Sequence, residues 1–165
     1  MGKLKVGLIG GGGPGNFFGH VHKRAIALDN SRELVAGALR SDPAASMEAA
    51  AAYDVTGYPS YDALLEDVRT GKQELDYVTI VTPNHAHYAP AKAFLEAGIP
   101  VLCEKPMTMT VAEAEELLRT AADNLLGRGA RVVILACTEI PVALKDDDAS
   151  EGRYVDATRA LAEAC

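Results

Sequence analysis

The apolar positions of this 165-residue chain fall into short runs that are separated by glycine, proline and charged residues. About six of the runs have the length of β-strands. They are apolar throughout rather than alternating, which predicts strands that are buried on both faces of a sheet. The predicted strands span residues 3–9, 34–39, 58–61, 77–82, 100–103 and 131–136.

Segments with helical character lie between these runs, so that strand and helix alternate along the chain. The predicted helices span residues 19–28, 43–53, 62–70, 86–97, 111–126 and 157–165, with Asp62 at an N-cap position and Gly98 at a C-cap position. Repeated βα units with short turns predict an α/β fold, namely a three-layer, doubly wound, Rossmann-like parallel sheet of about six strands. We expect residues 1–165 to form a single domain, with a surface loop over Lys145–Arg153.

Composition and charge exclude several classes of partner. The net charge of −7 comes without a clustered basic face, which argues against binding to nucleic acid. No apolar run approaches the roughly 18 residues needed to span a bilayer, and the N-terminus has no signal-peptide pattern. Cys103, Cys137 and Cys165 lack C-x-x-C spacing. We therefore expect a cytoplasmic protein with free thiols, no metal site and no membrane contact.

The glycine cluster after the first strand carries the most specific chemistry. Gly10, Gly12 and Gly15 fit the G-x-G-x-x-G pattern, and the loop also contains Gly13. Gly10 permits a tight turn, Gly12 lets a pyrophosphate approach the backbone, and Gly15 lets the helix pack close to the strand. Free N–H groups and the helix dipole favour phosphate, so the loop predicts binding of NAD(P). The alternative is a glycine-rich turn without a ligand.

The end of the second strand bears on the choice between the two cofactors. An NAD enzyme usually has an acidic residue there to accept hydrogen bonds from the ribose. This strand ends with Leu39, Arg40 and Ser41, and Asp42 comes one or two residues late. Arg40 suits a 2′-phosphate, which favours NADP. Alternatively, Arg40 is a solvated strand end.

Four further motifs carry a family resemblance. They are Gly19-His20-Val21-His22, residues 58–65 (YPSYDALL), residues 81–87 (VTPNHAH) and residues 103–107 (CEKPM). On these motifs, residues 4 to about 121 resemble the Rossmann domain of the glucose–fructose oxidoreductase / inositol dehydrogenase (Gfo/Idh/MocA) family. The resemblance implies that Thr82, Pro83 and Asn84 bind cofactor at the carboxyl end of the fourth strand and that His87 caps or lines the same crevice. For His20, His22 and His85 we expect packing or surface roles.

The motif after the fifth strand is expected to lie near the reacting groups. The resemblance implies that Glu104 and Lys105 are cofactor-binding, that Lys105 also contacts substrate near the nicotinamide, and that the Lys105–Pro106 bond is often cis. The alternative for Lys105 is a surface lysine at a turn. Family members continue into a second domain that supplies a catalytic histidine, whereas all four histidines here precede residue 90. We therefore expect a cofactor-binding module without catalytic activity.

The end of the chain resembles a different family. Residues from about 122 to 165, above all Cys137-Thr138-Glu139, are similar to the C-terminal end of aspartate/glutamate racemases. That resemblance implies a catalytic role for Cys137 as one of two cysteines. The motif that supplies the other cysteine is absent, and Cys103 is a weak substitute because it belongs to the oxidoreductase motif. The alternative for Cys137 is a small apolar residue at a strand end.

The junction between the two resemblances suggests an engineered chimera. It falls near residues 119–124, with residues 1–121 oxidoreductase-like and residues 122–165 supplying a strand and helix that complete the sheet. Four functions remain open: an NAD(P)-binding module, a structural chimera without a ligand, a residual racemase acting through Cys137, and a short oxidoreductase completed by a partner chain. A homodimer is consistent with apolar surface left near the sixth strand.

Overall fold

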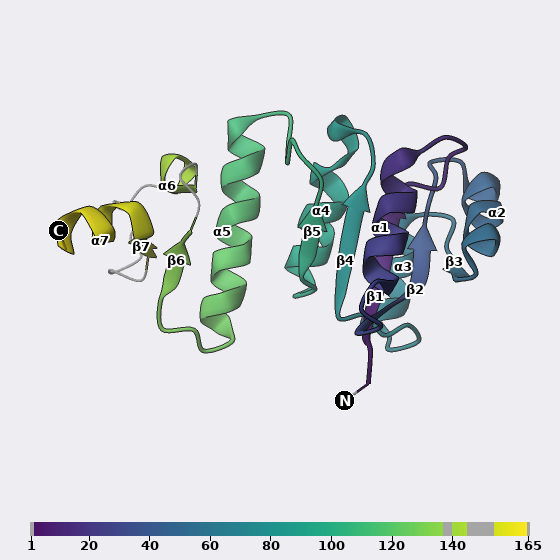
Figure 1. Cartoon of the computed structure of the whole chain (residues 1–165), viewed down its shortest axis with the longest axis horizontal. Coiled ribbons are helices and arrows are strands. Elements are labelled where there is room, and N and C mark those ends of the chain that lie inside the picture. Colours follow the sequence, from purple (N-terminus) through teal and green to yellow (C-terminus); the bar gives the residue numbers. More distant parts are fainter. Residues whose placement is uncertain (1, 137–139, 145–153, 165) are drawn as a thin grey trace. The chain divides into compact units, whose positions relative to one another are not determined.

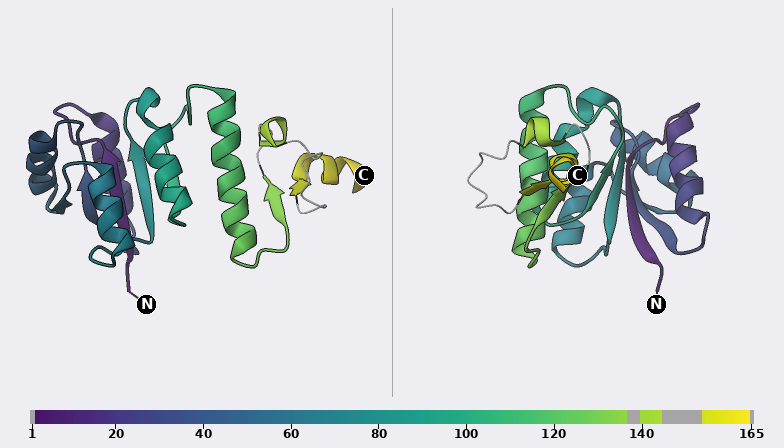
Figure 2. Two further views of the ribbon diagram at one scale, coloured as in Figure 1. Left: turned by 180° about the vertical axis from the view of Figure 1, so that it is seen from behind. Right: turned by 60° about the vertical axis from the view of Figure 1, so that its left-hand side comes forward.

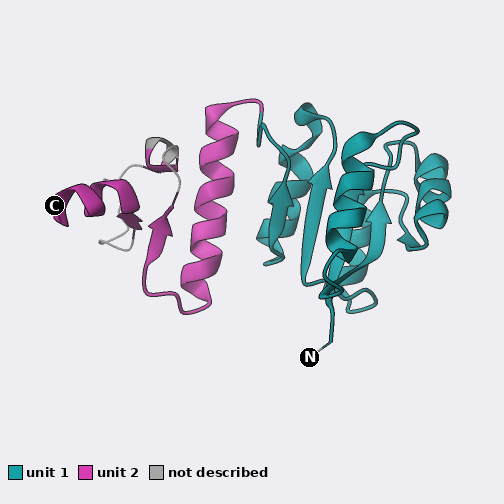
Figure 3. Cartoon of the chain, viewed as in Figure 1, with its two compact units in different colours: residues 1–108 teal, residues 109–165 magenta. Residues whose placement is uncertain are grey.

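The computed structural model describes residues 2–136, 140–144 and 154–164. Figure 1 shows the order of its helices and strands along the chain. The chain divides into two compact units, residues 1–108 and residues 109–165, which are coloured separately in Figure 3. Cys137 and the expected loop Lys145–Arg153 lie outside the described residues.

The first unit is built on a five-stranded parallel sheet in the order β3-β2-β1-β4-β5. The change of direction after β3 makes the sheet doubly wound, which confirms the predicted α/β, Rossmann-like fold. Its strands are β1 (Leu4–Gly10), β2 (Arg32–Ala38), β3 (Thr56–Gly57), β4 (Tyr77–Val81) and β5 (Val101–Cys103).

Helices cover both faces of this sheet, as the right-handed crossovers of a parallel sheet require. Helices α1 and α2 lie on one face, and α3 and α4 lie on the other (Figures 1 and 2). The helices are α1 (Phe17–Ala27), α2 (Pro43–Tyr53), α3 (Tyr61–Arg69), the 3-10 turn η1 (Asn84–Ala86) and α4 (Tyr88–Glu96).

Three of these helices begin at a side chain that caps the backbone. Asn16, Asp42 and Ser60 each accept a hydrogen bond from the backbone N–H three residues further on, at 3.1, 2.8 and 3.2 Å. Such caps satisfy N–H groups that have no partner within the helix. The predicted N-cap at Asp62 is wrong, because Ser60 caps α3 and Asp62 lies in its first turn.

The third strand also differs from its prediction over residues 58–61. It spans Thr56–Gly57, and Tyr58 follows it, donating its backbone N–H to Gly37 O at 2.9 Å. Pro59 has no N–H to extend the hydrogen bonding between the strands, and Ser60 is the N-cap of α3. Tyr58 is buried like a residue of a central strand, which explains why the sequence pattern suggested a strand there.

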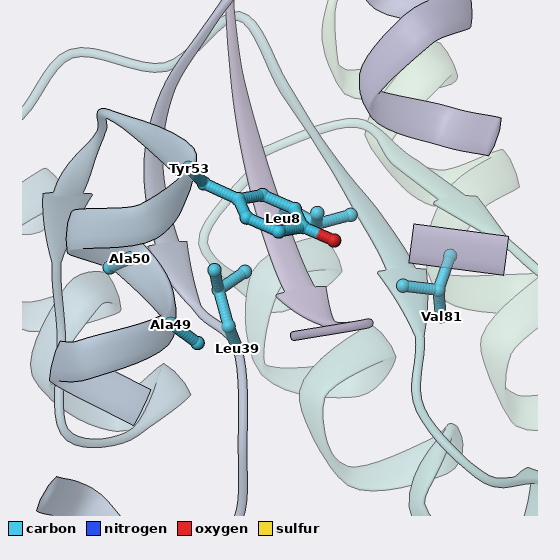
Figure 4. Packing of buried hydrophobic residues seen from close by; sticks show 6 residues of the cluster. All are labelled: Leu8, Leu39, Ala49, Ala50, Tyr53 and Val81. Atoms are coloured by element: carbon cyan, nitrogen blue, oxygen red, sulfur yellow. The ribbon is translucent and has the colours of Figure 1, made fainter. Parts of the chain in front are cut away.

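A cluster of buried side chains holds α2 against the sheet (Figure 4). It comprises Leu8, Leu39, Ala49, Ala50, Tyr53 and Val81. The alanines let α2 approach the strands closely, and Tyr53 fills the space above them. The Tyr53 hydroxyl reaches across the cluster and donates a hydrogen bond to Gly11 O at 3.0 Å. The core therefore also fixes the backbone of the glycine loop.

The second unit contains α5 (Val111–Gly127), β6 (Val133–Leu135), α6 (Ile140–Ala143), β7 (Tyr154–Asp156) and α7 (Ala157–Ala164). Helix α5 begins with a capping box in which Thr110 and Glu113 bond each other's backbone. The sixth expected strand is present as β6, but it pairs in parallel with β7 in a separate sheet of two strands. The expected sheet of about six strands therefore has five.

The signal for β7 was too short to be found in the sequence, because three residues cannot show a period of two. The interpretation of residues 1–165 as one domain stays a prediction. In the described part of the chain no helix is long and apolar enough to cross a bilayer.

Replacing Tyr53 with Phe removes the buried hydrogen bond to Gly11 O and leaves that carbonyl without its partner. We expect the free energy of unfolding, measured by urea titration, to fall by about 1–2 kcal/mol. The matched control is Tyr77→Phe, because no hydrogen bond in the described residues uses the Tyr77 hydroxyl. Equal losses in the two variants would contradict the role given to the Tyr53 hydroxyl.

Candidate functional site

A pocket of about 460 Å³ opens where β1, β2 and β4 end, at the carboxyl edge of the five-stranded sheet. This is the edge at which open parallel sheets bind ligands. Six of the predicted cofactor-binding residues line it: Gly10, Gly13, Arg40, Ser41, Thr82 and Pro83. The other six predicted residues, Gly12, Gly15, Asn84, His87, Glu104 and Lys105, are not among its lining residues.

Several lining residues were missed by the sequence analysis. Asn16 comes from the N-cap of α1, Tyr61 from the start of α3, and His85 and Ala86 from η1. Tyr61 lies in a motif that was noted, but its place in the pocket follows from the pairing of β3 with β2, which only the fold shows. Asn16 could have been found as an N-cap residue directly before a helix.

The glycine loop turns sharply as it leaves β1. Gly10, Gly11 and Gly15 have φ values of 82°, 84° and 76°, which side chains rarely tolerate. A Cβ at Gly10 would lie 2.9 Å from the backbone nitrogen of Thr82. The tight turn assigned to Gly10 is therefore present, and it takes place directly beside the end of β4.

Gly12 and Gly13 face opposite environments. A Cβ at Gly12 would lie 2.6 Å from Leu39 Cβ and 2.8 Å from Ala49 Cβ, and the Gly12 N–H donates to Leu39 O at 3.0 Å. Gly12 thus packs the loop onto the end of β2. At Gly13 nothing lies within 4 Å of an added Cβ, and Gly13 lines the pocket. The close approach of a ligand expected at Gly12 is offered by Gly13 instead.

The close packing of helix on strand expected at Gly15 is performed by Gly19. A Cβ at Gly19 would lie 2.0 Å from Gly11 O, whereas one at Gly15 would meet nothing within 4 Å. The packing glycine therefore comes four residues later than the G-x-G-x-x-G pattern places it. The connection from Gly12 to Gly19 is correspondingly longer, and Asn16 caps the helix within it.

The loop fits the pyrophosphate of a dinucleotide. Within the described residues, no hydrogen bond uses the N–H groups of Gly13 and Gly15. Both positions are open on the side where a Cβ would lie, and both come just before the N-terminus of α1. Unused N–H groups beside the positive end of a helix dipole bind anions.

The end of β2 presents a cation to the pocket. Arg40 is exposed, and it lines the pocket together with Ser41. The neighbouring carboxylate of Asp42 is used within the fold, because its Oδ1 accepts the hydrogen bond from Ala45 N that begins α2. This rim of the pocket therefore suits an anionic group.

His87 lies behind the pocket wall rather than in the pocket. Its side chain is 2% exposed, with Nε2 2.7 Å from Thr82 O and Nδ1 2.9 Å from Pro106 O. The Thr82 hydroxyl donates to Ala86 O at 3.1 Å, which closes η1 beneath it. His87 thus ties the end of β4 to the turn that follows β5.

The turn after β5 is held by α1 as well. Glu104 Oε1 lies 2.6 Å from Nε2 of His22, and Glu104 Oε2 accepts a hydrogen bond from Lys105 N at 3.3 Å. The hydrogen bond from His22 is the largest of the causes that hold the Glu104 pKa below its usual value. The Lys105–Pro106 bond is cis, as the resemblance implied, and Lys105 is exposed.

The thiol at the end of β5 is poorly suited to proton abstraction. Burial, followed by the charge of Glu104, raises the pKa of Cys103 to about 11. A neutral thiol is a weak base, so Cys103 offers no thiolate at neutral pH. In the described part of the chain, no cluster of three or more His, Cys, Asp or Glu side chains is arranged to hold a metal ion.

Comparison with known proteins shows the family of this chain. The sequence profile of an oxidoreductase family with an NAD-binding Rossmann fold, Gfo/Idh/MocA, matches residues 4–126. The chain belongs to the Gfo/Idh/MocA family. A curated relative, the uncharacterized oxidoreductase YfiI of Bacillus subtilis, is 34% identical over 118 residues, which are 69% of this chain and 30% of the relative.

Two similar solved structures are complexes with a nicotinamide nucleotide. An inositol dehydrogenase homolog from Azotobacter vinelandii, in complex with NADH and myo-inositol, is 36% identical with a TM-score of 0.66, covering 74% of this chain and 33% of its own. A biliverdin reductase from Synechocystis, in complex with biliverdin and NADP⁺, is 29% identical with a TM-score of 0.60, covering 73% and 35%. Members of the fold family therefore bind NAD or NADP, and this chain has their NAD(P)-binding Rossmann domain.

The chain spans about a third of the length of the relatives that it matches. A second profile, of Asp/Glu/hydantoin racemases, matches residues 95–165. The two matches overlap over residues 95–126, so the racemase-like segment begins earlier than the junction expected near residues 119–124.

The lowered pKa of Glu104 makes a prediction for acid stability. A carboxylate with a depressed pKa in the fold stabilises it above the pKa of the unfolded chain, and this contribution is lost as the pH falls through the folded-state pKa. The difference in unfolding free energy between the native chain and Glu104→Gln should shrink from about pH 7 to about pH 3, measured by urea titration. The control is the exposed Glu48→Gln. A difference that stays constant with pH would contradict the role of the His22–Glu104 pair.

Proposed function

We propose that the first unit binds NADP(H) in preference to NAD(H). The observation that carries this proposal is the end of β2, where Arg40 and Ser41 line the pocket and the Asp42 carboxylate caps α2. A 2′-phosphate gains charge-assisted hydrogen bonds from an arginine, whereas a 2′-hydroxyl gains most from a free carboxylate.

The rest of the pocket suits the other parts of the dinucleotide. The N–H groups of Gly13 and Gly15 are available to the pyrophosphate, and Thr82 and Pro83 extend the pocket beyond the loop. The turn that contains Lys105 follows β5, and β5 pairs with β4 in the sheet. When bound, the cofactor supplies a nicotinamide that accepts or donates hydride. The chain's own residues bind and orient it.

We further propose that the chain by itself is catalytically silent, so that Lys105 and Cys137 are idle. Proton transfer to a substrate needs a side chain within hydrogen-bond reach of it. His87 is enclosed between two carbonyl groups, and His22 is bonded to Glu104. His20 lies against the Tyr53 ring, with ring centres 5.6 Å apart. Of the four histidines, all of which are described, only His85 lines the pocket. A partner chain that completes the reaction is the alternative.

A second candidate is that the chain joins segments of two families as a designed chimera. The racemase profile and the oxidoreductase profile overlap over residues 95–126, and the boundary between the two compact units falls inside this overlap. In a purely structural chimera the glycine loop would bind no nucleotide. A racemase activity through Cys137 has less support, because Cys103 is held as a neutral thiol. A homodimer stays a prediction.

Calorimetric titration with NADPH and NADH tests the proposal. We expect the native chain to bind NADPH at least about ten-fold more tightly than NADH, because charge-assisted hydrogen bonds contribute about 1.5–3 kcal/mol. Arg40→Ala should remove this preference while leaving NADH binding unchanged. The control is Arg69→Ala, an exposed arginine on α3.

Equal affinities of the native chain for the two nucleotides would contradict the preference for NADP(H). Failure to bind either nucleotide at millimolar concentration would favour the purely structural chimera.

A further inference from the structure

The two nitrogens of the His87 ring face two acceptors of the same kind. Nε2 lies 2.7 Å from Thr82 O and Nδ1 lies 2.9 Å from Pro106 O. A carbonyl oxygen only accepts hydrogen bonds, so both ring nitrogens must donate. A neutral imidazole carries one N–H and the imidazolium carries two. Both hydrogen bonds therefore exist together only when His87 is doubly protonated.

We infer that His87 is a positioning residue that, as an imidazolium, braces the Lys105–Pro106 turn against the wall of the cofactor pocket. Its partner on one side, Thr82, lines that pocket. Its partner on the other side, Pro106, directly follows Lys105. The expected effect of His87 on nucleotide affinity rests on the proposed function. The brace itself does not, because it consists of contacts within the fold.

A second histidine also contacts this turn. His22, on α1, lies 2.6 Å from Glu104 Oε1, so the three residues 104–106 are attached to α1 through a carboxylate and to β4 through His87. Lys105 lies between these two attachments. The position of Lys105 therefore depends on two imidazole rings, neither of which lines the pocket.

Charged and titratable groups flank His87 on the turn, on η1 and on α4. Glu104 is the carboxylate on the turn, and its pKa is lowered mainly by the hydrogen bond from His22 and least by the charge of His87. The other titratable groups near the bonded atoms are Lys105 on the turn and His85 on η1. On α4, Lys92 pairs with Glu96 at 3.9 Å and lies over the Tyr88 ring at 5.8 Å.

Loss of the second proton breaks the brace on one side. The neutral ring can donate to Thr82 O or to Pro106 O, but the other carbonyl then faces a nitrogen lone pair inside the protein. Leaving a buried acceptor unpaired is costly, so the turn and the end of β4 should separate.

Nitrogen NMR of the ¹⁵N-histidine-labelled chain tests the brace without any nucleotide. The chain has four histidines, and the signals of His87 are those missing from His87→Gln. At about pH 6 we expect both nitrogens of His87 to be protonated. When the pH is raised, the backbone amides of Thr82 and Met107 should shift with the same midpoint as the His87 ring. A singly protonated His87 at that pH, or a titration that leaves both amides unmoved, would overturn the inference.

Measurement of NADH binding extends the test to the cofactor pocket. NADH is used because it lacks the 2′-phosphate of NADPH, whose own protonation would also change with pH. The native chain should bind NADH about five-fold more weakly at pH about 9 than at pH about 6, the equivalent of one hydrogen bond. His87→Gln should bind weakly at both values, and the exposed His20→Gln should follow the native chain. A pH dependence that persists in His87→Gln would overturn the role of His87. If NADH does not bind at all, the proposed function fails, and the NMR result alone decides on the brace.

Discussion

The contact between the backbones of Gly11 and Gly19 is the constraint on which the cofactor edge of the sheet depends. A Cβ at Gly19 would lie 2.0 Å from Gly11 O, so no other residue fits there without moving the helix or the loop. The contact sets the N-terminus of α1 directly against the end of β1. The segment between the two glycines must then pass around the helix start, where no hydrogen bond within the described residues uses the N–H groups of Gly13 and Gly15.

Other interactions converge on the same two elements. The Tyr53 hydroxyl bonds Gly11 O from the side of α2, and Lys23 of α1 donates to Tyr53 O at 2.8 Å while lying 4.6 Å from the centre of the Tyr53 ring. Helix α1 is also joined to the turn after β5 through His22 and Glu104. The parts of the pocket that we propose to bind the phosphates, ribose and nicotinamide are thus supported by bonds behind the pocket, which preorganise it for a ligand.

The sequence was sufficient to predict the main architecture of the first unit and six of the residues that line its pocket. Apolar runs without alternation marked buried parallel strands, and the carboxyl ends of those strands gave Gly10, Gly13, Arg40, Ser41, Thr82 and Pro83. The roles of Gly12 and Gly15 were assigned from a spacing, but the loop is longer than that spacing assumes. Which glycine faces Leu39, and which faces open space, depends on tertiary contacts that no local pattern contains.

Other features were missed for comparable reasons. The placement of His87 between two carbonyl groups requires knowledge of how the turn after β5 folds back on β4. Ser60 was overlooked as a cap because the apolar Tyr58 suggested a longer strand. In the second unit, the pairing of β6 with β7 joins segments about 20 residues apart, and three-residue strands carry too little pattern to reveal their partner.

The central claim is that the N–H groups of Gly13 and Gly15 receive the pyrophosphate of a dinucleotide. Backbone amide NMR of the ¹⁵N-labelled chain during addition of NADPH tests it most directly. The account predicts large, saturable shifts of the Gly13 and Gly15 amides, and a much smaller shift of the Gly12 amide, which is already bonded to Leu39 O. Saturable shifts confined to residues outside the loop, or no shifts at millimolar NADPH, would contradict it.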